Sequence, residues 1–291
     1  MDAIKYIIGN FGKFLRIFFK IRFPKTIYKS MGFKGIFSIS LNKQKIIFTN
    51  FRDEISNDIF YSGIFGNYEG FSLKIWNHLC LNAQKSYVLD IGGYTGVYSL
   101  IAASANSEIH IETFEPHPNT FLRLQKNIHS NNYKNITLNN FALSDRDGDI
   151  IFYNSKGISP SGFSSINHDF IEKDSGTMIC KGIDIRNVFQ KNYINKKISL
   201  IKIDVERAEL PLLNLIMDRI IRDKTCVLCE VLDYESYKNF DELFSKNNYH
   251  SIIIDDKKHT AVRVKELNGQ KKIGDNILFI PSDKALDLNN L

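Results

Sequence analysis

The chain has 291 residues, of which 43% are hydrophobic and 24% charged, with only six prolines. These proportions are typical of a globular protein with a sizeable core, and they exclude a disordered chain and a small disulfide-stapled fold. The formal net charge of +6 is confined to residues 1–30, which contain seven basic residues and one acidic residue, Asp2. The 38 basic and 32 acidic residues of the chain therefore leave 31 of each sign elsewhere, and no broad nucleic-acid-binding surface is expected.

The four cysteines, Cys80, Cys180, Cys226 and Cys229, do not form the framework of a secreted protein, which favours a reducing, cytoplasmic location. The run Cys226-Val-Leu-Cys229 predicts a strand, in which residues three apart point to opposite faces. This pair therefore predicts buried core rather than a metal site.

Residues 1–30 predict a basic amphipathic helical segment. Apolar residues from Ile4 to Ile21 recur at helical spacing, and Pro24 ends the pattern. Charges interrupt every apolar run before the roughly 18 residues that a membrane span needs, and no secretory cleavage site follows. Residues 3–22 therefore predict either a helix that lies on an anionic inner membrane surface, or a helix that packs on the protein or on a second copy in a homodimer.

Residues 31–70 predict a small β appendage. The short stretches 36–39 and 46–49 read as two strands, and Asn42 between them favours the turn of a hairpin. Residues 69–81 then have the apolar spacing of a helix.

Strands and helices alternate over residues 71–285, as in an open α/β domain. The expected strands lie near residues 86–90, 108–115, 135–142, 198–204, 226–231, 250–254 and 276–280. The expected helices between them lie near residues 97–105, 118–130, 208–221 and 235–247. Residues 148–182 lack helical spacing and predict a hairpin inserted between the third and fourth strands.

A glycine-rich turn follows the first strand of this domain. Residues 87–98 read as a buried strand that ends at Asp90, a turn that contains Gly92 and Gly96, and the start of a helix. The spacing differs from the dinucleotide pattern, because Tyr94 stands where the second glycine of that pattern would be. This favours a ligand with an amino-acid-like group, whose ammonium Asp90 can meet, over a pyrophosphate.

The second strand of the domain ends at Glu115, 19 residues after Gly96. An acidic side chain about 20 residues beyond the glycine turn is the expected partner of ribose hydroxyls. The two features together predict an adenosine-type cofactor.

With these motifs in place, the sequence resembles the FkbM family of methyltransferases over residues 60–281. The resemblance rests on five ordered stretches, which are Asp90–Gly96, Phe114–Pro118, Phe141–Asp145, Lys202–Glu206 with Ala208-Glu209, and Asn276–Phe279. The chain departs from the family's pattern at two places. The usual Ala-Asn pair of the glycine loop is Gly93-Tyr94, and the usual glycine of the Asp-Val-Glu-Gly-Ala-Glu signature is Arg207.

The resemblance implies a Rossmann-like class I methyltransferase, with a seven-stranded, mostly parallel sheet whose last strand is antiparallel. It also implies transfer of a methyl group from S-adenosylmethionine to a hydroxyl, commonly of a sugar, as in a surface glycan, or of a secondary metabolite. Asp90 and Gly92 would lie at the methionine end of the cofactor, Glu115 at the ribose, and Phe141 with Ala142 at the adenine. The expected cofactor-binding residues are Asp90, Gly92, Gly93, Tyr94, Thr95, Gly96, Glu115, Pro116, Phe141 and Ala142.

Several carboxylates are expected at the carboxyl edge of the sheet, where open α/β folds bind ligands. Asp204 is the first candidate for the base that takes the proton of the acceptor, followed by His117 and Glu206. Glu206 and Glu209 are equally well explained by the N-terminus of a helix, and His117 by a loop between two prolines. A divalent metal is the mechanistic variant, in which Asp204, Glu206 and Glu230 would offer oxygen ligands to Mg²⁺.

Two other functions stay open. A catalytically silent subunit that keeps the methyltransferase fold is favoured by Tyr94 and Arg207, and a nicotinamide-dependent oxidoreductase is disfavoured by the glycine spacing. Calorimetry with S-adenosylmethionine and with NAD would separate these alternatives from the methyltransferase.

Overall fold

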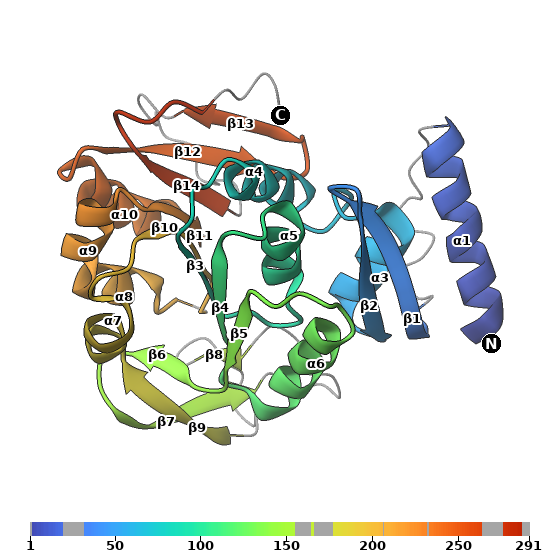
Figure 1. Ribbon diagram of the computed structural model, residues 1–291, viewed down its shortest axis with the longest axis horizontal. Coiled ribbons are helices and arrows are strands. Elements are labelled where there is room, and N and C mark those ends of the chain that lie inside the picture. Colours follow the sequence, from blue (N-terminus) through green and yellow to red (C-terminus); the bar gives the residue numbers. More distant parts are fainter. Residues whose placement is uncertain are drawn as a thin grey trace.

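The computed structural model places helices on both faces of a large sheet (Figure 1). It describes residues 2–19, 32–154, 164–165, 177–205, 207–231, 233–263 and 276–286. Eight strands form this sheet, in the order β13-β12-β14-β11-β10-β3-β4-β5. Their bounds are Thr260–Arg263, Tyr249–Asp255, Asn276–Pro281, Cys226–Glu230, Ile198–Ile203, Tyr87–Ile91, His110–Phe114 and Ile136–Asn139, in the same order.

Seven of the eight strands have the topology that the resemblance implies. β5, β4, β3, β10 and β11 are parallel neighbours, and β14, the last strand of the chain, runs antiparallel between β11 and β12. The eighth strand, β13, was not expected, because its four residues carry no apolar run. Cys226 and Cys229 are free thiols in separate core clusters on β11, as residues on opposite faces of a strand must be.

The two faces of the sheet carry different helices. α4 (Gly70–Leu81), α5 (Val97–Ala105) and α6 (Pro118–His129) contribute side chains to one core cluster, and α7 (Ile185–Tyr193), α8 (Glu209–Leu215), α9 (Met217–Asp223) and α10 (Tyr234–Ser245) to the other (Figure 1). With both faces covered, the central strands are mostly apolar, which explains their clear signal in the sequence. The helix predicted over 208–221 is two helices that meet at Ile216, and α7 was not predicted.

The predicted hairpin appendage consists of β1 (Lys34–Leu41) and β2 (Gln44–Phe51), which pair antiparallel. Asn42 and Lys43 form the two-residue turn with φ of 52° and 61°, the left-handed pair that a tight hairpin needs. The appendage also contains a helix that the alternating pattern did not reveal, α3 (Glu54–Ser62). It begins where Asp53 accepts a hydrogen bond from the Ser56 backbone N–H at 2.8 Å.

The strand predicted over 135–142 divides between two sheets. β5 ends at Asn139, and β6 (Ala142–Ser144) joins a second sheet with β9 (Thr177–Asp184), β7 (Gly148–Asn154) and β8 (Ser164–Ser165). β7 and β9 pair antiparallel, so the hairpin expected over 148–182 forms. The boundaries between the segments 1–30, 31–70 and 71–285 stay a prediction.

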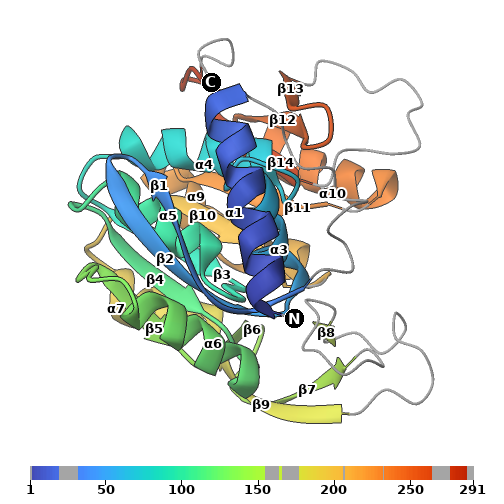
Figure 2. The same ribbon diagram turned by 90° about the vertical axis from the view of Figure 1, so that its right-hand side faces the viewer.

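α1 (Asp2–Phe19) lies at the outer edge of the molecule, beside α3 and the β1–β2 hairpin (Figure 2). The remainder of the basic segment, residues 20–30, lies outside the described residues. Among the helices that the structure describes, none has the length and apolar character needed to cross a membrane.

Candidate active site

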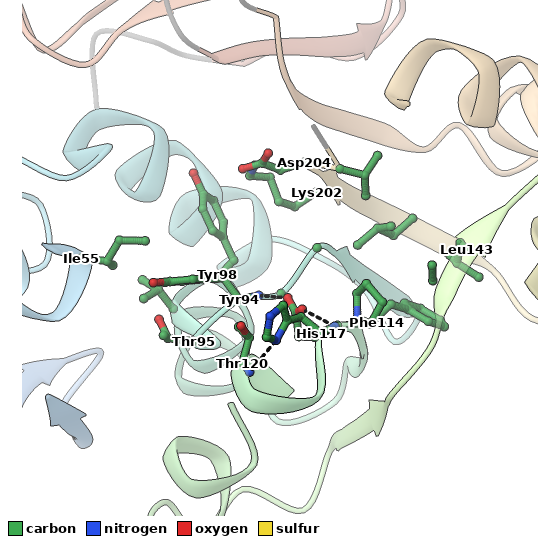
Figure 3. Close-up of a pocket in the computed structure, with 18 of the residues that line it drawn as sticks. Ile55, Tyr94, Thr95, Tyr98, Phe114, His117, Thr120, Leu143, Lys202 and Asp204 are labelled. Carbon is green, nitrogen blue, oxygen red and sulfur yellow. Dashed lines mark hydrogen bonds and ion pairs between the residues drawn. The ribbon is translucent and has the colours of Figure 1, made fainter. Parts of the chain in front are cut away.

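A pocket opens at the carboxyl ends of β3, β4 and β10 (Figure 3). The predicted site residues that line it are Gly92, Gly93, Tyr94, Thr95, Glu115, Pro116, His117, Phe141, Ala142 and Asp204. Asp90 and Gly96 do not belong to the lining, and Glu206 lies outside the described residues.

The glycine turn between β3 and α5 is packed so tightly that side chains would not fit. A Cβ on Gly92 would lie 1.9 Å from the backbone oxygen of Asp204, and one on Gly93 would lie 2.2 Å from Thr113 Cγ2. Gly92 also has a φ of 84°, which L side chains rarely adopt. Because these glycines have no side chains, the turn packs close to Asp204 and Thr113, and its backbone forms part of the pocket wall.

Glu115 holds the turn from the end of β4. Its Oε2 accepts a hydrogen bond from the Tyr94 backbone N–H at 3.0 Å, and its Oε1 accepts one from the His117 backbone N–H at 2.9 Å. Burial raises the pKa of the Glu115 carboxyl to about 8, although the two N–H donors act in the opposite direction. Each oxygen keeps a second lone pair, so the carboxylate can still accept from the hydroxyls of a ligand.

Asp90 lies beneath the turn rather than in the lining of the pocket. Its Oδ2 accepts a hydrogen bond from Ser99 Oγ at 2.5 Å, and Ser99 Oγ also lies 2.6 Å from Thr113 Oγ1. Burial raises the pKa of Asp90 to about 6. In this structure Asp90 connects β3 to α5, and its direct contact with a methionine group stays a prediction.

The far end of the pocket has an apolar wall that suits a flat ring. Phe141 meets Phe114 edge to face, with 5.5 Å between ring centroids, and the neighbouring Ala142 and Leu143 are buried. Aromatic and aliphatic surfaces of this kind stabilise a nucleobase by excluding water.

Thr95 offers a further test of whether these residues fit S-adenosylmethionine. Its Oγ1 is buried and has no hydrogen-bond partner among the described residues, although the residue lines the pocket. A buried hydroxyl without a partner is costly, so its presence here favours a polar ligand group. Together with the glycine turn, Glu115 and the apolar wall, the residues present fit this cofactor.

The other side of the pocket contains a buried ion pair that the sequence predicted only in part. Lys202 Nζ donates to Asp204 Oδ2 at 3.1 Å, with side-chain exposures of 3% and 28% (Figure 3). Burial disfavours the ammonium, but the carboxylates of Asp204, Glu69 and Glu230 outweigh it and raise the pKa of Lys202 above its usual value. None of the described residues donates a hydrogen bond to Asp204 Oδ1, which leaves that oxygen for a ligand.

Two tyrosines and a glutamate surround this ion pair. Lys202 Nζ lies 5.0 Å from the centre of the Tyr98 ring, and the Tyr98 hydroxyl donates to Glu69 Oε2 at 2.5 Å. Tyr68 completes the wall of the pocket beside them. Lys202, Tyr98, Tyr68 and Glu69 were not predicted as site residues. Only Lys202 carried a signal, since it is a lysine within an otherwise apolar strand.

His117 and Glu209 have structural roles at helix ends. His117 lines the pocket, but its Nδ1 also accepts a hydrogen bond from the Thr120 N–H at 3.4 Å as the N-cap of α6, and burial lowers its pKa. Glu209 Oε1 accepts from the N–H groups of Val205 and Arg207 before α8. For Glu209 the helix-terminus explanation therefore fits the contacts.

The Mg²⁺ variant finds no support in the described part of the chain. No group of three or more His, Cys, Asp or Glu side chains there is placed to hold a metal ion. Of the three expected ligands, Glu206 lies outside that part.

The two departures from the FkbM pattern share a backbone property. Tyr94 has a φ of 45° and Arg207 a φ of 79°, both in the left-handed region where glycine and asparagine are preferred. The family's usual asparagine and glycine at these positions are therefore explained by conformation. In this chain bulkier residues adopt these left-handed conformations, at the cost of local strain.

Several solved structures of methyltransferases are similar to this chain. A SAM-dependent methyltransferase from Agrobacterium tumefaciens is 12% identical, with a TM-score of 0.46, over 86% of this chain and 71% of that chain. An FkbM methyltransferase from Methylobacillus flagellatus KT is 12% identical, with a TM-score of 0.40, over 78% and 55% of the two chains. Precorrin-6y C5,15-methyltransferase from Geobacter metallireducens GS-15 is 14% identical, with a TM-score of 0.38, over 72% and 86%. No curated protein matches the chain.

The strand order and the pocket at the glycine turn define an S-adenosylmethionine-dependent methyltransferase of class I. Residues 90–254, more than half of the chain, match the family model of the methyltransferase FkbM domain. The chain belongs to the FkbM methyltransferase family.

Proposed function

We propose that this methyltransferase acts on a hydroxyl oxygen, either of a sugar in a surface glycan or of a secondary metabolite. The observation that carries the proposal is the Asp204 carboxylate, which lines the pocket with Oδ2 paired to Lys202 and Oδ1 toward no described donor. A hydroxyl is a poor nucleophile until a neighbouring group accepts its proton, and a carboxylate at this position can do so. A thiol acceptor would need such a base less, because a thiol ionises at a pKa of about 8.5.

S-adenosylmethionine, when bound, supplies an electrophilic methyl group, and its sulfur takes the electron pair of the broken bond. Asp204 would accept the proton of the acceptor hydroxyl as the oxygen–carbon bond forms. Lys202 would hold the carboxylate in place through Oδ2. Glu115 and the glycine turn would orient the cofactor, because correct placement of the two reactants supplies much of the rate.

The Asp204→Asn variant tests this proposal, because it keeps the size of the side chain and removes the charge. We expect methyl transfer to fall by about 10²–10⁴-fold, the usual contribution of a positioned proton acceptor. Binding of S-adenosylmethionine, measured by calorimetry, should persist. Turnover is measured as release of S-adenosylhomocysteine with a panel of monosaccharides, nucleotide sugars and phenols.

Asp218→Asn is the matched control, since Asp218 is an exposed residue of α9 outside the pocket lining. It should leave both turnover and cofactor binding unchanged. Near-normal turnover of Asp204→Asn would show that Asp204 is structural, and His117 or Glu206 would be tested next. Wild-type turnover that disappears in EDTA and returns with Mg²⁺ would replace the proton-acceptor role by a metal.

A further inference from the structure

α1 exposes a row of large apolar side chains to solvent. Ile4, Ile7, Phe11 and Phe14 are 63%, 67%, 56% and 46% exposed. Their spacing of three, four and three residues places them in one stripe along the helix. Figure 2 shows α1 at the front of the molecule, and the exposure of these four side chains places the stripe on the solvent side of the helix.

The opposite side of α1 is fastened to the body of the protein. Tyr6 stacks on Phe60 with 5.6 Å between ring centroids and meets Phe33 edge to face at 5.9 Å. The Tyr61 hydroxyl donates to the backbone oxygen of Lys5 at 3.2 Å, and Lys5 Nζ donates to the Gly32 oxygen at 3.0 Å. These contacts determine which face of α1 points outward. The exposed stripe is therefore a property of the folded chain and not of an unattached end.

The charge of the chain identifies the partner. Residues 1–30 carry seven basic residues and one acidic residue, while the rest of the chain is balanced. A second copy would bring an equally positive segment against the first, and the two would repel each other. Anionic lipid headgroups would instead attract the basic residues while the apolar stripe enters the boundary with the acyl chains.

We propose that α1 binds the surface of an anionic lipid membrane, with the stripe of Ile4, Ile7, Phe11 and Phe14 in the interface, and that the net positive charge of residues 1–30 attracts this segment to the headgroups. The helix lies in the plane of the surface, because it is not long and apolar enough to span the bilayer. The proposal concerns lipid binding alone, so it stands or fails independently of the acceptor.

Flotation of the full chain with vesicles tests this interface. Wild-type protein should float with vesicles made of equal parts of phosphatidylglycerol and phosphatidylcholine at low salt, and only weakly at high salt. With vesicles of phosphatidylcholine alone it should remain in the bottom fraction of the gradient. Ile7→Ser combined with Phe11→Ser should lower the partition into anionic vesicles by about tenfold or more, because it removes apolar surface from the interface. Ile4→Ser combined with Phe14→Ser changes the other half of the same stripe and should have a similar effect.

The matched control combines Leu122→Ser and Val262→Ser, which are 61% and 64% exposed on other elements and should leave flotation unchanged. Circular dichroism checks that each variant is folded. Equal flotation of the stripe variants and the wild type would overturn the proposal, as would equal binding to neutral vesicles. A dimer that does not float and that the stripe variants convert to monomer would assign the stripe to a second copy instead.

Discussion

At the scale of single residues, Glu115 combines burial with two backbone N–H donors. Burial raises the pKa of its carboxyl to about 8, so near pH 7 most of the ligand-free protein carries a proton there. Ribose hydroxyls that donate to this side chain would favour its ionised form. We therefore expect S-adenosylmethionine binding at pH 7 to release about one proton, and release to cease above pH 9. Calorimetry in buffers of different ionisation enthalpy measures this number directly.

Glu115→Gln provides the control for this prediction, because its amide resembles the protonated carboxyl but cannot ionise. Cofactor affinity of the wild type should rise with pH up to about 8, by at most about tenfold per pH unit, and that of the variant should not. An affinity of the wild type that is independent of pH would show that Glu115 does not meet the ribose as an anion.

Gly92 can be tested against a second glycine with an unusual backbone. Gly92 and Gly148 both have positive φ, at 84° and 132°, but a Cβ on Gly148 would meet nothing within 4 Å. In both Ala variants, backbone strain should lower the free energy of unfolding by about 1–3 kcal/mol. Gly92→Ala should lower the free energy of unfolding by about 1–3 kcal/mol more, because its Cβ collides with the Asp204 carbonyl. This variant should also bind the cofactor more weakly. Denaturant unfolding and calorimetry measure the two effects, and equal losses would contradict the collision.

At the scale of elements, α4 is attached to the sheet by an aspartate far away in the sequence. Asp256, in the turn between β12 and β13, accepts hydrogen bonds from the backbone N–H groups of Phe71 and Ser72 and from the Ser72 hydroxyl. These bonds satisfy the first turn of α4 and set the position of Tyr68 and Glu69 just before it. The additional strand β13 thus supports one wall of the pocket.

Asp256→Ala should lower the free energy of unfolding by about 0.5–2 kcal/mol, the usual loss for a helix cap, and should also reduce turnover. Asp233→Ala is the matched control, because Asp233 also accepts hydrogen bonds from the backbone N–H and the hydroxyl of a serine, Ser236, at the start of a helix, α10. Asp233→Ala should lower the free energy of unfolding by a similar amount and leave turnover unchanged. Unchanged turnover in both variants would show that α4 is positioned by its other contacts.

Elements that carry their own signal could be predicted from the sequence. β3, with its apolar run and following glycines, and α6, with Pro118 in its first turn, lie close to the expected residues. α3 was missed because it has only nine residues and only Asp53 marks its start, although Ile55 and Ile59 have the four-residue spacing of a helix. β5 was predicted too long because Phe141 and Ala142 continue the apolar pattern, although the chain there passes to another sheet.

At the scale of the whole molecule, the predicted site residues that line the pocket belong to local motifs, and so do the unpredicted Lys202 and Tyr98, whereas the unpredicted Tyr68 arrives from a distant segment. The glycine turn, Glu115 and Asp204 were found because each lies at the end of a strand in a recognisable motif. Tyr68 precedes the whole α/β sheet and reaches the pocket only through the packing of α4, and the neighbouring Glu69 accepts a hydrogen bond from Tyr98. No local pattern encodes that contact, so the sequence alone could not reveal it.

The balance of buried and exposed carboxyls leads to a prediction for the stability of the whole chain. Burial raises the pKa of Asp90 to about 6 and of Glu115 to about 8, so the ligand-free fold retains protons that the unfolded chain releases near pH 4. This contribution to stability is full below pH 4 and is lost as the pH rises to about 8. Asp223 acts in the opposite sense, because its hydrogen bonds lower its pKa and its contribution is lost only in acid.

We therefore expect the melting temperature of the ligand-free protein to fall between pH 5 and pH 8, by about 2–4 °C for each kcal/mol that is lost. Saturating S-adenosylmethionine should reduce this fall, because the ligand favours ionised Glu115 and its stabilisation grows over the same interval. Glu115→Gln should remove most of this decline in melting temperature. Asp90→Asn should remove a smaller part of it, at lower pH. Scanning calorimetry across the interval measures all three curves. A ligand-free melting temperature that rises steadily from pH 5 to pH 8 would mean that both carboxyls are already ionised in the fold, and that the pocket holds its negative charge before any ligand arrives.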